Sequence, residues 1–159
     1  MKKVLITGAK GNIGTVLSRG LKKNYNLTLL DLPETDVMDY KSIEKLAKDK
    51  DVLIHLAWNA KTENFRTKTS DPDNVLMAKN AYEASLKTGV KRVIMASSVH
   101  ADDFRNFHGP GLLFPNRIPN PQTPYGRSKV KIEEMGRQYA KKGLEVVCVR
   151  FGVVNSKRE

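Results

Sequence analysis

The sequence is poor in the residues that build metal centres and disulfide frameworks. Its 159 residues include one cysteine, Cys148, and three histidines, His55, His100 and His108. A single cysteine excludes an internal disulfide, and the histidines show no zinc-ligand spacing with it. Cys148 lies in the apolar run 146–149, where a small side chain suits a buried strand. We therefore predict no metal site and no catalytic thiol.

Long apolar runs are also missing. The longest are strand-sized, far short of the ~20 residues that a membrane-spanning helix needs. Only two residues separate Met1 from the apolar run Val4–Ile6, which leaves no room for the charged and hydrophobic regions of a signal peptide. We expect a soluble, cytoplasmic protein with no membrane partner.

Acidic residues are fewer than basic ones. The 28 Lys and Arg against 17 Asp and Glu give a formal net charge of +11 at pH 7, which can attract nucleic acid. The basic residues are scattered over expected helix ends and turns, as at 22–23, 87 and 141–142, which is typical of a solvated surface. We expect no nucleic-acid partner.

Short apolar runs alternate with amphipathic segments along the chain. The expected strands are 4–6, 27–30, 37–38, 51–57, 90–97 and 145–150, and the expected helices are 13–21, 40–47, 75–86 and 125–142. This order favours parallel βαβ units with right-handed crossovers. The sequence predicts one α/β domain over residues 1–159, with a doubly wound parallel sheet of about six strands and helices on both faces. Ligands of such sheets bind at the carboxyl ends of the strands.

Three glycines, Gly8, Gly11 and Gly14, follow the first expected strand and open the first expected helix. This spacing lets the backbone approach a pyrophosphate, while the amides of Asn12 and Ile13 lie at the positive end of the helix. The alternative is a plain turn between a strand and a helix.

Asp31 ends the second expected strand, where a carboxylate can accept the ribose hydroxyls of an adenosine. The same carboxylate would repel a 2′-phosphate, which favours NAD over NADP. Lys10, in the glycine loop, argues in the other direction because a lysine there could hold a second phosphate. We predict NAD as the cofactor.

Tyr125 and Lys129 stand four residues apart on an expected helix. Residues at this spacing share a helix face, so the ammonium can sit beside the phenol and help to make it an acid/base. An ordinary exposed helix pair is the alternative.

Taken in order, these motifs resemble the extended short-chain dehydrogenases/reductases of the NAD-dependent epimerase/dehydratase group. The resemblance covers nearly the whole chain and is carried by 7–14, 36–39, 55–57, 74–75 with Asn80, 93–98, 125–129 and 149–152. It implies an NAD-binding Rossmann fold. By resemblance, Asp36 and Val37 would border the adenine, Leu56 and Ala57 would pass under the cofactor, and Asn80 would belong to the same site.

The resemblance also implies a catalytic trio of Ser98, Tyr125 and Lys129. Tyr125 would take the substrate hydroxyl proton, Lys129 would hold the nicotinamide ribose, and Ser98 would hydrogen-bond the reacting oxygen. Ser97 cannot be separated from Ser98 by spacing alone, and alignment with the family favours Ser98.

Residues 96–100 are similar to the Ala-Ser-Ser-Asn-His segment of uronate dehydrogenases, although Val99 replaces the Asn. This similarity implies that His100 touches substrate; Lys61 and Arg66 would meet a substrate carboxylate or face water. Three functions are open: an NAD-dependent oxidoreductase acting on a sugar or sugar acid, a nucleotide-sugar epimerase/dehydratase, or an NAD-binding module or inactive fragment without turnover.

Relatives of the extended type continue beyond the last expected strand, so the resemblance implies a chain truncated relative to the family. Their dimers pack two helices that here span about 73–88 and 125–142. The apolar residues Tyr82, Ile132, Met135 and Tyr139 would either form such a homodimer interface or cover the sheet.

Overall fold

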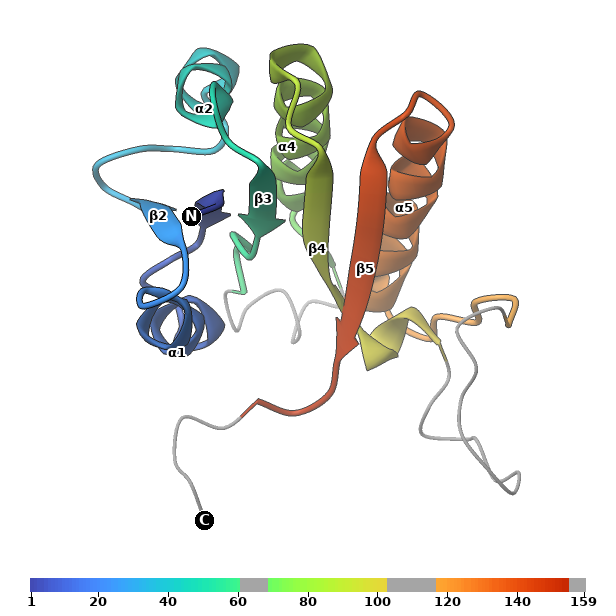
Figure 1. Cartoon of the computed structure of the whole chain (residues 1–159). Coiled ribbons are helices and arrows are strands. Elements are labelled where there is room, and N and C mark those ends of the chain that lie inside the picture. The colour runs from blue at the N-terminus through green and yellow to red at the C-terminus, as the bar shows by residue number, and fades with distance from the viewer. Residues whose placement is uncertain (61–68, 103–116, 155–159) are drawn as a thin grey trace.

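A parallel sheet with helices on its two faces is the frame of the molecule (Figure 1). The computed structural model describes residues 1–60, 69–102 and 117–154. The elements are β1 (Lys3–Thr7), α1 (Asn12–Leu21), β2 (Asn26–Leu30), α2 (Tyr40–Ala47), β3 (Val52–His55), α4 (Asp73–Thr88), β4 (Arg92–Ser98), a 3-10 turn η1 (Val99–Ala101), α5 (Pro124–Ala140) and β5 (Glu145–Phe151). The strand order is β2-β1-β3-β4-β5, and all neighbours pair in parallel.

The described sheet has five strands rather than about six, because the strand expected at 37–38 is wrong. The Asp36 side chain accepts a hydrogen bond from the Met38 N–H at 2.9 Å, and the Asn80 Nδ2 donates to the carbonyls of Val37 and Met38. Val37 is buried in the core. Side chains therefore satisfy this backbone, which needs no neighbouring strand.

Strand side chains alternate between two apolar clusters, one on each face of the sheet. Leu5 and Leu53 pack in the cluster that contains residues of α2, α4 and α5. Val4, Ile6 and Ile54 pack in the other cluster, against residues of α1. This alternation follows from the two-residue period of a strand. The predicted doubly wound arrangement, with helices on both faces, is confirmed.

The termini of the two longest helices were well marked in the sequence. Gly89 ends α4 in the left-handed conformation at φ 78°, and Gly143 follows α5 at φ 95°. At the start of α5 the Thr123 hydroxyl accepts a hydrogen bond from the Gly126 N–H at 3.0 Å. This cap fixes where the first turn of α5, and with it Tyr125, begins.

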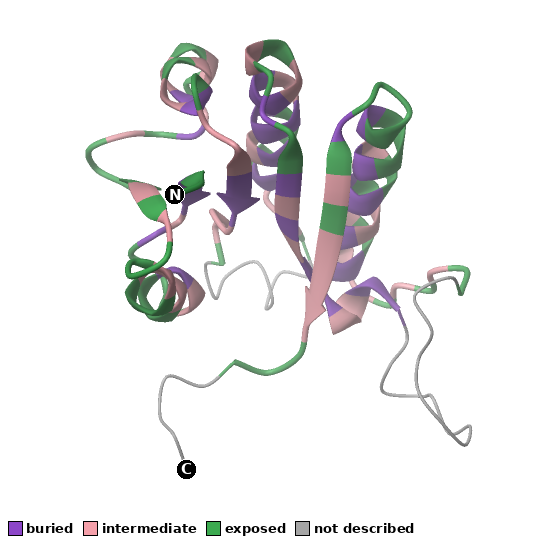
Figure 2. Ribbon diagram, in the orientation of Figure 1, coloured by how far each residue is buried: buried purple, intermediate pink, exposed green. Residues whose placement is uncertain are grey.

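The apolar residues that could have formed a dimer interface mainly cover the sheet. Tyr82 and Ile132 are fully buried, Tyr139 is nearly so, and Met135 packs against the same core. Burial is greatest in β1 and β3, inside the sheet, whereas β5, at one of the two edges of the described sheet, is half-buried or exposed throughout (Figure 2). None of the helices within the described ranges has the length and apolar character to cross a bilayer.

Candidate functional site

A groove of about 640 Å³ opens beside the carboxyl ends of β1 and β3. The chain connections diverge between these two strands, since β2 lies on one side of β1 and β3 on the other. Ligands of doubly wound sheets bind at such a switch point. The predicted cofactor residues that line the groove are Gly8, Gly11, Asp31, Asp36, Val37, Leu56 and Ala57.

The three glycines at the junction of β1 and α1, two in the connecting loop and Gly14 in the first turn of the helix, serve different purposes. Gly8 has φ 70°, and a Cβ there would lie 2.6 Å from the Ala57 nitrogen. A Cβ on buried Gly14 would collide with the Gly8 carbonyl oxygen. A Cβ on Gly11 would meet only that same oxygen, at 3.3 Å. Packing thus requires glycine at positions 8 and 14, whereas Gly11 leaves the backbone at the groove wall accessible.

Helix α1 begins at Asn12 with Gly11 as its N-cap. Its first N–H groups, those of Asn12 and Ile13 among them, and the positive end of its dipole therefore lie at the glycine loop. This arrangement suits a doubly charged pyrophosphate. The loop, the groove and the carboxylate described next together fit a dinucleotide.

Asp31 is held at the rim of the groove by two backbone donors. Its Oδ2 accepts from the Lys10 N–H at 2.6 Å, and its Oδ1 accepts from the Leu32 N–H at 2.8 Å. The Lys10 ammonium donates to both carboxylate oxygens of Glu34, at 2.8 and 2.6 Å. Glu34 was not predicted as part of the site, because nothing in the local pattern indicates that the loop after β2 folds back onto the glycine loop.

Asn80 does not line the groove in the described part of the chain. Its side chain donates to the carbonyls of Val37 and Met38, at 2.9 and 3.1 Å. Asn80 therefore holds the wall that Asp36 and Val37 form, and direct contact with a cofactor stays a prediction for this residue.

Ser98, Tyr125 and Lys129 come together where β4 ends and α5 begins. Burial raises the pKa of the Tyr125 phenol above its ordinary value, and a hydrogen bond with Ser98 opposes this shift without cancelling it. The Lys129 Nζ donates to the Ala96 carbonyl at 2.8 Å and lies 5.6 Å from the centre of the Tyr125 ring. The sequence predicted the shared helix face; the structure adds Ser98 as a direct partner of the phenol.

Lys129 carries its ammonium in a buried environment. The residue is 3% exposed, and burial lowers its pKa to about 7, while the Glu133 carboxylate opposes that shift. Its Nζ lies 3.4 Å from the centre of the Trp58 ring, a cation–π contact. Lys129 is thus poised between its charged and neutral forms near neutral pH.

Trp58 lies between the groove and the trio, and this residue was not predicted as part of the site. The residue lines the groove, and its ring meets the Tyr125 ring edge-on with centres 5.6 Å apart. Its position directly after Leu56 and Ala57 was a usable signal, since the chain contains a single tryptophan.

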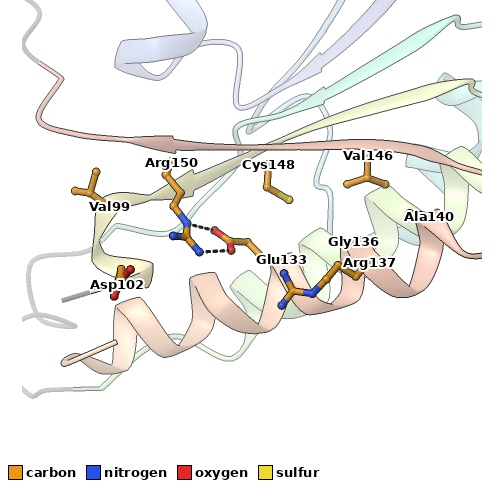
Figure 3. Close-up of a pocket in the computed structure, with 9 residues that line it drawn as sticks. All are labelled: Val99, Asp102, Glu133, Gly136, Arg137, Ala140, Val146, Cys148 and Arg150. Carbon is orange, nitrogen blue, oxygen red and sulfur yellow. Dashed lines mark hydrogen bonds and ion pairs between the residues drawn. The ribbon is translucent and has the colours of Figure 1, made fainter. Parts of the chain in front are cut away.

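The two adjacent serines have different partners. The Ser97 hydroxyl donates to the Glu133 Oε1 at 2.5 Å, whereas Ser98 bonds Tyr125. Arg150 donates from Nε and Nη2 to the two Glu133 oxygens, at 2.9 and 2.8 Å, across a second groove of about 470 Å³ (Figure 3). Burial raises the pKa of Glu133, but the bonds from Arg150 and Ser97 lower it below its ordinary value. These contacts support Ser98, rather than Ser97, as the catalytic candidate.

His100 lies beside the trio, as the sequence analysis expected for a substrate contact. The centre of its ring lies 5.6 Å from that of Tyr125, and its backbone N–H donates to the Ser98 Oγ at 3.2 Å. A Cβ on Gly126 would collide with the His100 carbonyl oxygen, so α5 packs closely on η1. Lys61 and Arg66, also expected near substrate, lie outside the described residues.

His55 supports the floor of the site. It is 1% exposed, and its Nδ1 lies 2.8 Å from the Thr7 Oγ1, across the β1–β3 pair. Burial, with a smaller effect of the Lys129 charge, lowers the pKa of His55 to about 3. His55 is therefore neutral at physiological pH and joins the two strands whose ends form the groove.

This geometry agrees with similarities to known proteins. The model of a family described as "NAD dependent epimerase/dehydratase family" matches residues 4–159. The chain is 29% identical to L-arabinose 1-dehydrogenase (NAD(P)(+)) of Haloferax volcanii, with 96% of this chain and 67% of that protein covered. It is 30% identical to uronate dehydrogenase of Pseudomonas putida, with 94% and 60% covered.

The structure superimposes on a solved mutated uronate dehydrogenase with a TM-score of 0.75 and 26% identity. The match covers 94% of this chain and 58% of that one. The present chain thus spans somewhat under two thirds of the uronate dehydrogenases that it resembles.

Proposed function

Because the chain belongs to the NAD dependent epimerase/dehydratase family, we propose that it binds NAD and oxidises a sugar or a sugar acid. The observation that carries this proposal is the meeting of Ser98, Tyr125 and Lys129 beside the groove with the glycine loop. The similarity to an arabinose dehydrogenase and a uronate dehydrogenase supports the substrate class.

The glycine loop and the segment after β2 would hold the cofactor. Gly11 and the first amides of α1 would receive the pyrophosphate, and Asp31 would accept the adenosine ribose hydroxyls. When bound, the nicotinamide supplies the acceptor for a hydride from the substrate carbon. Leu56 and Ala57, which line the groove, would pass under the cofactor and exclude water from that face.

The trio would handle the substrate proton. Ser98 would hydrogen-bond the substrate hydroxyl, and the Tyr125 phenolate would take its proton as the substrate C–H bond breaks. A free phenol has a pKa of ~10, so the phenolate needs a nearby positive charge at neutral pH. The buried Lys129 ammonium, 5.6 Å from the ring centre, would supply that charge.

A nucleotide-sugar epimerase is the second candidate function, because the same three side chains could move a proton in both directions. An NAD-binding module without turnover is the third. Release of free NADH distinguishes the first from the second, since an epimerase regenerates its cofactor in each cycle. Bound NAD without any sugar turnover would indicate the third.

The test is NADH release, followed by absorbance, with hexuronates and aldoses as substrates. Tyr125→Phe should keep NAD binding and lower turnover by on the order of 10³-fold, because general acid/base catalysis is lost. Tyr25→Phe is the matched control, because Tyr25 is a partly buried tyrosine in the apolar cluster on the α1 face of the sheet. This variant should retain full turnover. Undiminished turnover in Tyr125→Phe would contradict the role of Tyr125 as the acid/base.

We also propose that the predicted homodimer would use the outer faces of α4 and α5. Apolar side chains remain accessible there: Leu76 is 41% exposed, and Val75 and Met135 line the same shallow depression. Basic residues surround them, Lys79 and Lys131 among others, so self-association should strengthen as salt screens their repulsion. Light scattering across a salt series measures this.

A further inference from the structure

Lys10 bridges the two loops at one end of the groove. Its backbone N–H donates to Asp31, and its ammonium donates to both oxygens of Glu34 and, at 3.2 Å, to the Leu32 carbonyl. The glycine loop and the loop after β2 are therefore tied together by one side chain. This contact lies at the rim beside Asp31, where the adenosine ribose is proposed to bind.

The loop after β2 is folded so that Glu34 can reach Lys10. The Thr35 N–H donates to the Asp31 carbonyl at 3.0 Å, which closes a turn over residues 31–35. The turn brings Glu34 back toward the glycine loop. Three carboxylates, those of Asp31, Glu34 and Asp36, then lie within one short segment of this rim.

The ion pair decides how the rim would receive a phosphate. The hydrogen bond with Lys10 lowers the pKa of Glu34, which keeps this carboxylate ionised beside the lysine. With its ammonium matched by Glu34, Lys10 has little attraction left for another anion, and Asp31 and Asp36 repel one. A Lys10 released from Glu34 would instead offer its charge to a phosphate at this position.

We propose that the Lys10–Glu34 ion pair sets the selectivity of the groove for NAD over NADP, by occupying the lysine that would otherwise bind the 2′-phosphate. This inference rests on the proposed function, which places the adenosine ribose at Asp31. It assigns to Glu34 a role in specificity that acts together with the repulsion from Asp31.

Binding measurements on the 159-residue chain test the inference without any turnover. NAD⁺ and NADP⁺ are titrated by calorimetry and by the fluorescence of Trp58, which lines the groove and is the single tryptophan of the chain. Glu34→Gln should raise the affinity for NADP⁺ about tenfold at low ionic strength and leave that for NAD⁺ nearly unchanged. The gain should shrink as salt is added. The Lys10 and Glu34 side chains are 58% and 66% exposed, so the fold should tolerate this change.

Two further variants separate the ion pair from net charge. Glu145→Gln makes the same charge change in another exposed pair, with Arg92 at 2.7 Å, on β5 at the opposite end of the strands. It should alter neither affinity. Lys10→Gln added to Glu34→Gln should remove the gain for NADP⁺, because the lysine released from Glu34 is then absent.

The outcomes are distinct. An unchanged NADP⁺ to NAD⁺ ratio in Glu34→Gln, with NAD⁺ bound by the unaltered chain, would overturn the inference and leave the proposed function standing. An equal gain in Glu145→Gln would overturn it too, because net charge alone would then explain the effect. A folded, unaltered chain that binds neither dinucleotide would overturn the inference together with the proposed function.

Discussion

Lys129 places its amino group where solvent barely reaches it. Its ammonium is compensated by the Ala96 carbonyl, the face of Trp58 and the carboxylate of Glu133. His55 from β3 and Cys148 from β5 also lie within electrostatic reach of this charge. A buried ammonium costs stability, and perturbed titratable groups of this kind gather at functional sites, which supports the role proposed for Lys129 beside the phenol.

The lowered pKa of Lys129 makes stability depend on pH. The unfolded chain protonates this lysine below about 10.5, whereas the folded chain does so only below about 7. Between these values the unfolded state binds more protons, so stability should rise with pH; below about 7 the full destabilisation is present. Lys129→Met should therefore be more stable than the unaltered chain at pH 7, by roughly 2 kcal/mol.

This gain should fade as the pH is raised toward 10, and turnover should be lost at every pH. Denaturant unfolding across a pH series measures the effect. Lys131→Met is the matched control, because Lys131 lies exposed on the same helix and should show no gain. A gain that is the same at pH 7 and pH 10 would argue against a buried, titrating ammonium.

The residues of the site that the sequence revealed are those with a local signature. The glycine spacing, Asp31 at a strand end, and Tyr125 with Lys129 at four residues are visible in short windows. Glu34 acts through Lys10, 24 residues away, and no short window contains both residues. Glu133 could have been found, since it lies four residues after Lys129 on the same helix face.

Gly20 in α1 and Gly136 in α5 have very different surroundings. No atom lies within 4 Å of a Cβ built on Gly20, whereas a Cβ on Gly136 would come within 2.7 Å of the Tyr82 hydroxyl and 2.9 Å of Val146 Cγ1. Gly20→Ala should stabilise the chain by about 0.5–1 kcal/mol through helix propensity. Gly136→Ala should destabilise it by ~1–3 kcal/mol through overpacking between α5, α4 and β5.

Denaturant midpoints of these two alanine variants test the packing of α5 directly. Both carry the same substitution in a helix, so their difference reports the surroundings rather than the residue type. Equal effects in Gly20→Ala and Gly136→Ala would mean that α5 does not pack against Tyr82 as described.

Strands and helices with strong periodicity were predicted well, and the weakest element was predicted wrongly. Val37 and Met38 are apolar and short, so their pattern alone cannot distinguish a strand from a buried turn. Asn80, 43 residues away from Val37, decides the outcome by binding the carbonyls of both residues. A partner at that distance in the sequence gives no local signal.

In the molecule as a whole, the residues of the candidate site gather at the carboxyl ends of the strands. The glycine loop follows β1, Asp31 follows β2, Leu56 and Ala57 follow β3, and Ser98 ends β4. Helix α5 supplies the remaining two residues of the trio from its first turns. This convergence follows from parallel strands, whose carboxyl ends share an edge, and the alternating sequence pattern was sufficient to predict it.

All the proposed roles depend on NAD binding at the carboxyl ends of the strands. Calorimetric titration of the 159-residue chain with NAD⁺, in parallel with its Gly11→Ala variant, measures this binding. We expect saturable binding at about micromolar Kd, weakened about tenfold by Gly11→Ala, because the added methyl would block the approach of the pyrophosphate. The fold should tolerate this methyl, since its one close neighbour is the Gly8 carbonyl oxygen at 3.3 Å. No binding by a chain shown to be folded, or equal binding by both proteins, would contradict NAD binding at this site.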